Sequence, residues 1–362
     1  MRRLRLRHPQ GTTHLVVGSG ALTGALPDLR VWLAGRAVFV VTTPRVMKLH
    51  GSVLETLAPL AGRLGVLEVE EGEAAKTLAR AGALWERLLA EGGKRDSRLL
   101  AFGGGSVGDL AGFVAACFLR GVEVAQLPTT VLAQVDASIG GKTAIDMPQA
   151  KNSVGAFHHP AFVVSDAAWL ATLPADEVRS GLVEALKMAA LLDLDLLSAI
   201  ERDLGALLDG DPEALGAVVS GGAAAKVAIV ERDPDERGER ALLNFGHTLG
   251  HALETASQYS GLKHGEAVAY GILFALRLAE RRGLDPAFAE RLRRLIGRLG
   301  LPPLPRCEAA ELMGLMARDK KAREHGLAWV LPVAPGRGEV VEGIPAAEVE
   351  AELGAFLENG GG

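Results

Sequence analysis

Short buried apolar runs alternate with helical segments over residues 1–165, and this alternation limits the possible folds more than any other feature of the sequence. Strand-like runs stand at 37–42, 64–69, 98–102, 122–127 and 162–165, and the stretch 74–90 has helical periodicity. Strands that are separated by helices form parallel sheets with helices on their faces. We therefore predict a doubly wound α/β domain with a parallel sheet over residues 1–160.

The second half of the sequence has a different period. From about Pro174 onward the chain consists of long Ala- and Leu-rich segments that are broken at clusters of glycine and proline. A short strand pair is predicted near its end, at 327–333 and 339–341. We predict a mainly α-helical domain over 161–362, with a boundary that rests on the change of period alone.

Composition narrows the class of protein. The chain has 362 residues, of which 48% are hydrophobic, and this is enough apolar material for two domains. A net charge of −5 does not favour nucleic acid or an anionic membrane as partner. The apolar stretch 111–119 ends at Arg120 and is too short to span a membrane, and no apolar signal region follows the N-terminus. The sequence indicates a soluble, cytoplasmic protein.

A glycine-rich turn follows the predicted strand at 98–102. Gly103, Gly104 and Gly105 precede Ser106–Asp109 and an apolar helix. In this arrangement backbone N–H groups and a helix N-terminus bind a phosphate. The turn matches neither GxGxxG at that spacing nor the P-loop pattern. A nucleotide-binding turn and a plain strand-to-helix turn both remain open.

A second polar stretch, LPTTVLAQVDASIGGKTAID, follows another predicted strand. It contains Thr129, Thr130, Asp136 and, after a glycine pair, Lys142. Hydroxyls together with a lysine suit a ribose–pyrophosphate or a substrate phosphate. The threonines suit the capping of a helix equally well.

The stretch NFGHTLGHALE places His247 and His251 four residues apart, on one face of a helix. A metalloprotease has a glutamate directly after the first histidine, but Thr248 stands there, so the metalloprotease version of this motif is excluded. A catalytic zinc ion usually takes three protein ligands and combines histidine nitrogen with carboxylate oxygen. Further ligands must therefore come from elsewhere in the chain.

His264 in GLKHGEAV and Glu184 in SGLVEALK are the candidates for those ligands. A carboxylate on an apolar helical face is costly unless it is paired or bound to a metal. Lys187 lies three residues after Glu184 on the same face, and it is able to pair with this carboxylate without a metal. Spacing does not decide whether His247, His251 or both bind a metal.

Several cationic residues lie in glycine-rich or apolar contexts: Lys142, Lys151, Lys187, Lys226, Arg240, Lys320 and Lys321. Each is compatible with an ordinary solvated surface charge. If they gather in one cleft, they suit a small substrate with more than one negative group. The two cysteines, Cys117 and Cys307, lack CxxC spacing, so neither a disulfide framework nor a thiolate zinc site is expected.

Together these motifs resemble the 3-dehydroquinate synthase family. The resemblance runs through EGEAAKT, GGGSVGDLAGF, LPTTVLAQVDASIGGKT, KNSVGAFHHP, LVEALK, RALLNFGHTLGHALE, HGEAV and DKK. It implies a homodimeric cytoplasmic enzyme of the shikimate pathway, with an N-terminal α/β NAD-binding domain, an α-helical metal- and substrate-binding domain, and an active site between them. The implied reaction converts 3-deoxy-D-arabino-heptulosonate 7-phosphate to 3-dehydroquinate and phosphate, with catalytic NAD and a divalent metal, zinc or cobalt.

The resemblance also assigns roles to individual residues. The implied metal ligands are Glu184, His247 and His264, which leaves His251 as an active-site residue. The implied NAD contacts are Glu71, Gly72, Glu73, Ala74, Ala75, Lys76, Gly105, Ser106, Val107, Gly108, Asp109, Thr129, Thr130, Lys142, Lys151, Trp169, Leu170, Ala171 and Thr172. The implied substrate contacts are Asp136, Lys142, Asn152, Lys187, Lys226, Arg240, Asn244, His251, one of Lys320 and Lys321, and Arg120, which would reach the phosphate in the neighbouring subunit. Of these, Lys142, Asn152, Lys187 and His251 are the expected catalytic residues.

One position departs from the family pattern. After the first predicted strand of the α/β domain the family commonly has an aspartate and then an asparagine, whereas this chain has Thr43 and Arg45. An acidic residue normally binds the ribose 2′-OH of NAD, and an arginine accommodates the 2′-phosphate of NADP. The preference between the two cofactors is therefore left open.

The implied reaction consists of an oxidation, a loss of phosphate, a reduction, a ring opening and an aldol closure. A metal held by two imidazoles and one carboxylate keeps a net positive charge and open positions, so it lowers the pKa of a bound hydroxyl. The departing phosphate is able to take the next proton, while His251, Lys187 and Asn152 orient the substrate and move protons. The alternatives are a related sugar-phosphate cyclase or metal-dependent polyol dehydrogenase of the same fold, and a catalytically silent nucleotide-binding protein.

Overall fold

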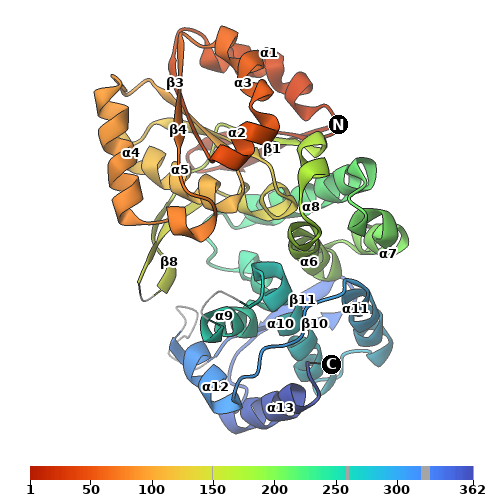
Figure 1. Cartoon of the computed structure of the whole chain (residues 1–362). Coiled ribbons are helices and arrows are strands. Elements are labelled where there is room, and N and C mark those ends of the chain that lie inside the picture. The colour runs from red at the N-terminus through yellow and green to blue at the C-terminus, as the bar shows by residue number, and fades with distance from the viewer. Residues whose placement is uncertain (149, 258–260, 319–326, 362) are drawn as a thin grey trace. The chain divides into compact units, whose positions relative to one another are not determined.

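The computed structural model describes residues 1–148, 150–257, 261–318 and 327–361. The chain divides into two compact units, which are described one at a time (Figure 1). The first unit comprises Met1–Pro174 together with Gly210–Asp235, and the second comprises Ala175–Asp209 together with Glu236–Gly362.

A seven-stranded sheet forms the centre of the first unit, with strand order β1-β2-β9-β6-β5-β3-β4. β1 is antiparallel to β2, and the other neighbouring strands run parallel. The strands of this sheet are β1 (Arg2–His8), β2 (Gly11–Gly18), β3 (Ala37–Thr42), β4 (Arg63–Glu68), β5 (Arg98–Gly103), β6 (Glu123–Pro128) and β9 (Phe162–Asp166). All the strands predicted for the α/β domain are therefore confirmed.

Helices cover both faces of this sheet, as Figure 1 shows for its red and orange segments. Along β3 the side chains alternate: Val38 and Val40 are buried against one layer, and Phe39 and Val41 are buried against the other. The first layer contains α1 (Ala21–Leu33) and α3 (Ser52–Leu57), and the second contains α4 (Leu78–Ala90) and α5 (Gly105–Cys117). A strand that is buried on both faces reads as a continuous apolar run, which is why the sequence revealed it.

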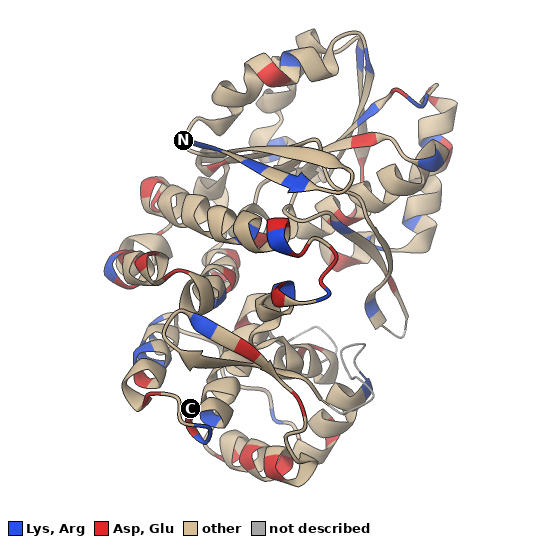
Figure 2. Cartoon of the chain, turned by 180° about the vertical axis from the view of Figure 1, so that it is seen from behind, with Lys and Arg blue, Asp and Glu red and all other residues tan. Residues whose placement is uncertain are grey.

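Some parts of the first unit differ from the prediction. The N-terminal hairpin β1–β2 was not predicted, although RRLRLRH alternates with the period of a strand; its arginines appear as blue segments after the N mark in Figure 2. The predicted helix 74–90 begins only at Leu78, because Gly72–Ala75 form the 3-10 turn η2 and the Thr77 hydroxyl caps α4. A second hairpin, β7 (Lys142–Met147) with β8 (Ala150–Phe157), was also missed.

The limits of the first unit differ from the boundary expected at residue 160. β9 hydrogen-bonds to both β2 and β6, so the sheet, and with it the first unit, extends beyond that residue. Helix α8 (Pro212–Arg232) also returns to this unit and packs against β1, β2 and the short helix η4 (Ala133–Ala137). A change of period cannot reveal a helix that packs back onto an earlier domain.

In the part of the chain that the structure describes, α8 is the one helix long and apolar enough to cross a membrane. Half of its apolar window is buried inside the protein, as in a core helix. The short elements completing the first unit are α2 (Pro44–His50), η1 (Ala58–Leu60), η3 (Phe118–Arg120) and η5 (Ala167–Thr172).

A buried lysine joins three segments of the first unit. The side chain of Lys76 is 2% exposed, and its Nζ donates hydrogen bonds to Asp109 Oδ2 in α5, at 2.9 Å, and to Asn152 Oδ1 in β8. Glu73 and Asp146 lie 3.4 and 4.0 Å from the same nitrogen. Burial alone would lower the pKa of Lys76, but these carboxylates, Asp109 first, outweigh burial and hold its pKa above the ordinary value. Lys76 therefore stays charged and ties η2, α5 and the β7–β8 hairpin together.

The second unit is mainly helical, as predicted. Its elements are α6 (Ala175–Leu192), α7 (Leu194–Leu208), η6 (Glu239–Asn244), α9 (His247–Ala256), α10 (His264–Glu280), α11 (Pro286–Arg298), α12 (Ala309–Arg318), the hairpin β10 (Trp329–Ala334) with β11 (Arg337–Val341), and α13 (Ala346–Glu358). α10 is buried along most of its length and packs against α6, α9, α11 and α13. The strand pair is confirmed, and α13 is a further helix that the sequence analysis did not predict.

Glycines let the backbones of α6 and α9 approach α10 closely. A Cβ atom on Gly265, in the first turn of α10, would lie 2.0 Å from the carbonyl oxygen of Ser180 in α6. A Cβ atom on Gly271 would lie 1.8 Å from the carbonyl oxygen of Gly246, the residue before α9. Gly246 has a φ of +79°, which favours glycine on its own account. The glycines of NFGHTLGHALE and HGEAV therefore set the distances between these three helices.

We expect Gly265→Ala to destabilise the second unit. Alanine normally stabilises a helix relative to glycine by up to about 1 kcal/mol, but here the new methyl group meets a backbone carbonyl oxygen, and overpacking costs about 1–3 kcal/mol. Urea unfolding should show a lower midpoint. The matched control is Gly297→Ala in α11, where a Cβ atom meets nothing within 4 Å, so this variant should be as stable as the parent or more stable. Equal stability of the two variants would contradict the close approach.

We also expect Lys76→Met to destabilise the first unit, because it leaves the partly buried carboxylate of Asp109 without its counter-charge. Breaking a buried ion pair by removing one partner costs about 3–5 kcal/mol. The measurement is the free energy of unfolding. Arg80→Ala is the control, since it removes an exposed ion pair with Glu70 and such pairs contribute about 1 kcal/mol or less. A loss no larger than that of the control would refute the role assigned to Lys76.

Candidate functional site

Three side chains that the sequence analysis proposed as metal ligands converge in the second unit. Glu184 lies in α6, while His247 and His264 are the first residues of α9 and α10. Glu184 Oε1 lies 3.8 Å from His247 Nε2 and 3.7 Å from His264 Nε2, and the ligand atoms all lie within 4.8 Å of one another. Donor atoms bound about 2 Å from a tetrahedral zinc ion are about 3.4 Å apart. The group is therefore close to the size that a zinc ion requires.

The hydrogen bonds at the other ring nitrogens orient both histidines. His247 Nδ1 lies 3.2 Å from the carbonyl oxygen of Phe245, and His264 Nδ1 lies 3.0 Å from Glu254 Oε2. A carbonyl oxygen only accepts, and so does a carboxylate, so both Nδ1 atoms are assigned the proton. Both Nε2 atoms then turn a lone pair toward Glu184, which is the tautomer a metal ligand needs.

Charges around His264 act on its pKa in opposite directions. Burial lowers the pKa, but the hydrogen bond and negative charge of Glu254, followed by the charge of Glu184, raise it above the ordinary value. The same two carboxylates that hold a proton on this ring also favour a divalent cation beside it.

A second group of possible ligands, His251, Glu254 and His264, shares one histidine with the first. The bond from His264 Nδ1 to Glu254 favours the first group, because it leaves Nε2 of His264 facing Glu184 and His247. The ring of His251 lies beside both histidines, with centroids 5.2 Å from His247 and 6.0 Å from His264. The role of His251 as an active-site residue that does not bind the metal stays a prediction.

Glu184 is fully buried and forms an ion pair with Lys187, whose side chain is 1% exposed. The pairing considered from the sequence is therefore present. Among the residues that the structure describes, however, no group donates a hydrogen bond of good geometry to either carboxylate oxygen of Glu184. Buried acceptors without donors are costly. A cation between Glu184 and the two Nε2 atoms would satisfy Oε1, which faces both nitrogens, while Oε2 lies against Lys187. The residue types and their buried oxygens fit a zinc or cobalt ion.

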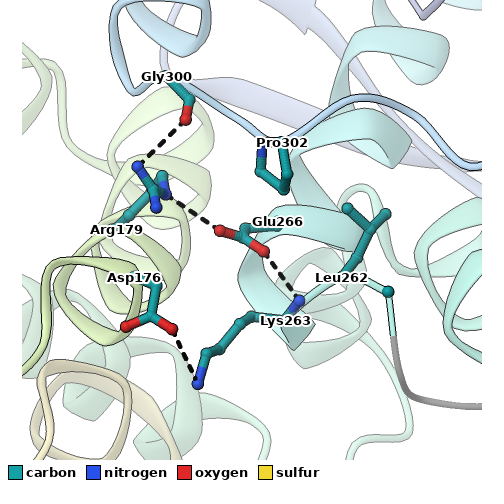
Figure 3. Close-up of a pocket in the computed structure, with 8 residues that line it drawn as sticks. Asp176, Arg179, Leu262, Lys263, Glu266, Gly300 and Pro302 are labelled. Atoms are coloured by element: carbon teal, nitrogen blue, oxygen red, sulfur yellow. Dashed lines mark hydrogen bonds and ion pairs between the residues drawn. The ribbon is translucent and has the colours of Figure 1, made fainter.

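The first turn of α10 is fixed by a network that lines a pocket (Figure 3). Glu266 Oε2 accepts a hydrogen bond from the backbone N–H of Lys263 at 2.9 Å, and its Oε1 accepts one from Arg179 Nε at 3.0 Å. Arg179 also donates to the carbonyl oxygen of Gly300 at 3.1 Å, and Lys263 Nζ pairs with Asp176 at 3.3 Å. The charged side chains of the pocket pair with one another. They fix the N-terminal end of α10, where the candidate ligand His264 lies.

The other predicted site residues of the second unit lie in α6 and η6. Lys187 and Arg240 are each 1% exposed, so they are not solvated surface charges. Asn244 Nδ2 donates to Glu236 Oε1 at 3.0 Å. The substrate contacts of these residues stay predictions, and Lys320 and Lys321 lie outside the described residues.

Most of the predicted NAD contacts of the first unit follow the carboxyl ends of the strands of its large sheet. They are the segments Glu71–Lys76 after β4, Gly105–Asp109 after β5, Thr129–Thr130 after β6 and Trp169–Thr172 after β9, whereas the exposed Lys142 and the half-buried Lys151 lie in the β7–β8 hairpin. Because these strands run parallel, their carboxyl ends lie at the same edge. Open α/β sheets bind nucleotides there. The position supports the predicted role of these segments, which itself stays a prediction.

Packing explains part of the glycine-rich turn without a ligand. A Cβ atom on Gly108 would lie 2.7 Å from the side chain of Gln126, and one on Gly112 would lie 2.3 Å from the side chain of Thr143. Thr130 Oγ1 accepts a hydrogen bond from the backbone N–H three residues later, at 3.1 Å, which is the capping role considered from the sequence. These contacts are compatible with both interpretations of the turn.

The predicted substrate residues of the first unit are partly engaged with their neighbours. Lys226 Nζ, in α8, donates to the carbonyl oxygen of Asp136 at 2.6 Å and pairs with its carboxylate. Asn152 has a φ of +49° and gives its amide oxygen to Lys76. Arg120 is exposed and has a φ of +67°. The remaining predicted substrate residue of this unit is the exposed Lys142, at the start of β7.

Sequence reasoning missed Glu254. Its side chain is 6% exposed and bonds to His264. A signal was present: His247, His251 and Glu254 follow one another at the spacing i, i+4, i+7, which places all three on one face of a helix.

Comparison with known proteins identifies the family of this chain. Residues 66–180 match the model of the 3-dehydroquinate synthase N-terminal region, and residues 181–322 match that of the C-terminal region. A 3-dehydroquinate synthase of Geobacter metallireducens is 44% identical over 87% of this chain and 88% of its own length. One of Xanthomonas campestris is 47% identical over 79% of this chain and 80% of its own.

Solved structures agree in fold. A 2-epi-5-epi-valiolone synthase of Streptomyces hygroscopicus, with NAD+ and Zn2+ bound, is 28% identical, covers 95% of this chain and 96% of its own, and has a TM-score of 0.85. A 2-deoxy-scyllo-inosose synthase with NAD+ and Co2+ has a TM-score of 0.88 at 24% identity and covers 98% of this chain and 99% of its own. An iron-containing alcohol dehydrogenase of Thermotoga maritima, 17% identical and covering 95% of this chain and 97% of its own, shares the fold with a TM-score of 0.70. The predicted dehydroquinate synthase-like fold is thereby confirmed, and the chain belongs to the 3-dehydroquinate synthase family.

Proposed function

We propose that this chain converts 3-deoxy-D-arabino-heptulosonate 7-phosphate to 3-dehydroquinate and phosphate, with NAD in the first unit and a divalent metal at Glu184, His247 and His264. The convergence of two imidazole nitrogens and one buried carboxylate from three helices carries this proposal. Relatives that are 44% and 47% identical bear the name of this enzyme. Structural neighbours with bound NAD+ and Zn2+ or Co2+ support the choice of cofactors.

Bound NAD supplies a hydride acceptor that is restored within the same turnover, and the bound metal lowers the pKa of a substrate hydroxyl. The protein must then bind the anionic groups of the substrate and exclude water. Lys187 and Arg240 are suited to this, because a buried cation interacts strongly with a carboxylate or phosphate. We propose that these cations provide affinity for the anionic groups of the substrate, and that the metal site activates the substrate hydroxyl.

His251 is the proposed proton carrier. Its ring lies beside those of His247 and His264. In these two histidines Nδ1 forms a hydrogen bond and Nε2 faces Glu184. A histidine titrates near neutral pH, so it is able both to accept and to donate a proton. Asn152, whose amide oxygen accepts a hydrogen bond from Lys76, is proposed to orient the substrate. In the first unit, Lys142 is the proposed cationic contact of both NAD and substrate, and Lys151 is a proposed cationic contact of NAD.

The proposed cofactor site follows the carboxyl edge of the sheet. At β3 the Thr43 hydroxyl caps α2 and Arg45 is exposed, so Arg45 is accessible to a 2′-phosphate. Positions 43 and 45 therefore supply no carboxylate for the ribose 2′-OH of NAD. We propose NAD because the similar solved structures contain NAD+. A cytoplasmic homodimer, in which the exposed Arg120 reaches the partner's substrate phosphate, is part of the same proposal.

Substituting metal ligands and cations should separate binding of the metal from turnover. We expect His247→Ala and Glu184→Ala to lose stoichiometric zinc, measured by atomic absorption, and to lose turnover with it. Lys187→Ala and Arg240→Ala should keep the metal but lower kcat/KM roughly 30-fold to several thousand-fold, since losing a buried charged contact costs about 2–5 kcal/mol. Full zinc content in the first pair of variants would disprove the ligand assignment.

The products distinguish the proposed reaction from its alternatives. With the heptulosonate phosphate as substrate, we expect one inorganic phosphate per 3-dehydroquinate and no accumulation of NADH, since the hydride returns to the substrate. A polyol dehydrogenase of the same fold would instead form NADH in proportion to product, and a silent nucleotide-binding protein would release no phosphate. A related cyclase would act on a different sugar phosphate, so turnover of glucose 6-phosphate but not of the heptulosonate phosphate would favour it.

A further inference from the structure

One buried carboxylate beside the candidate metal ligands has no role in the function proposed above. Glu254 lies in the last two turns of α9, its side chain is 6% exposed, and Oε2 lies 3.0 Å from His264 Nδ1. The bond crosses from α9 to α10, two helices that pack against each other directly. It meets the one ring nitrogen of His264 that does not face Glu184.

The chemical nature of its partner sets Glu254 apart from two other buried glutamates of the second unit. Glu266 bonds to Arg179, and Glu352 pairs with Arg277 and Arg281. A guanidinium is charged at all accessible pH values. An imidazole is charged only when both its nitrogens carry a proton, or when a metal replaces one of these protons and draws electron density from the ring. His264 is therefore a stronger partner for the buried carboxylate of Glu254 when a cation occupies its Nε2.

We propose that Glu254 is a positioning residue for the metal: it accepts the Nδ1 proton of His264, fixes the rotation and tautomer of the ring, and strengthens Nε2 as a donor to a divalent cation. The inference rests on the proposed metal site. Metal-binding histidines commonly donate their second N–H to a carboxylate or a carbonyl oxygen, and removing such a partner weakens metal binding 10- to 100-fold.

The two histidines of the site differ in this respect. His247 donates to a neutral backbone carbonyl at 3.2 Å, whereas His264 donates to a carboxylate at 3.0 Å. A charge-assisted hydrogen bond is roughly twice as strong as a neutral one, so His264 should be the more basic ligand. Lys187 meanwhile pairs with Glu184 and offsets part of its negative charge. Glu254 supplies a second negative charge close to the cation without occupying a coordination position.

The test is a Co2+ titration of metal-free, full-length protein, followed by visible absorption and by competition with a chelator. We expect Glu254→Leu, which keeps much of the side-chain volume, to weaken Co2+ binding about 10- to 100-fold. Glu254→Gln keeps an oxygen acceptor for the Nδ1 proton, so its affinity should fall between those of the wild type and the leucine variant. Glu290→Ala removes an exposed glutamate of α11 (57% exposed) and should change nothing.

Two results of the titration would overturn the proposal. An unchanged affinity in Glu254→Leu would show that the hydrogen bond is merely structural. An equal loss in Glu254→Gln and Glu254→Leu, together with retained Co2+ in His247→Ala, would show that Glu254 is itself a ligand in the group with His251 and His264. If wild-type protein binds Co2+ no better than Glu184→Ala does, the metal site of the proposed function fails, and the inference fails with it.

A measurement on the unmodified chain covers the case in which the leucine variant does not fold. In Zn2+-loaded protein with 15N-labelled histidine, His264 should carry its proton on Nδ1 and the metal on Nε2, as read from the nitrogen chemical shifts. A proton on Nε2 of His264, or metal bound at Nδ1, would overturn the proposal without any substitution at Glu254.

Discussion

The close approach of three helix backbones is the constraint on which the candidate site depends. At Gly265 the first turn of α10 lies against the carbonyl oxygen of Ser180, one helical turn before Glu184 in α6. At Gly271 the middle of α10 lies against Gly246, the residue before His247. Since the ligand atoms must lie within a few ångströms of one cation, helices separated by a layer of side chains would hold them too far apart. Glycine is the residue that removes this layer.

Helix starts are a second common element of the site. His247 and His264 each occupy the first position of a helix; α9 begins directly after Gly246, whose backbone is in the left-handed region, and α10 begins at a side-chain cap. For α10 the cap is Glu266, which is itself held by Arg179 of α6. The same contact between α6 and α10 therefore sets both the start of the helix and the distance from its first side chain to Glu184. Position and direction of the histidine ring follow from one packing arrangement, completed by the hydrogen bond at Nδ1.

Sequence patterns revealed what depends on local periodicity and on motif spacing. Strands buried on both faces, such as Ala37–Thr42, could be identified in this way, and so could a group of candidate ligands, from which the family resemblance selected Glu184, His247 and His264. What escaped depends on partners distant in the sequence: the return of α8 to the first unit, the position of β9 between β2 and β6, and the bond from Glu254 to His264. The glycine-rich turn shows the same limit. A side chain at Gly108 would collide with Gln126 of the next strand, β6. No local pattern contains that neighbour.

Charged residues of the first unit illustrate how such a site stays folded before it binds a ligand. Lys76 is held by Asp109 and Asn152, and Lys226 by Asp136. A buried cation without a counter-charge would cost several kcal/mol, so a protein that needs cations for an anionic ligand must pair them in its absence. If Lys226 contacts an anionic substrate as proposed, binding exchanges one anionic partner for another, and the net gain in free energy is a difference between two charged contacts. Affinity for that anion would then depend on how well its oxygens replace those of Asp136, and selectivity would arise from the geometry of that replacement as well as from charge.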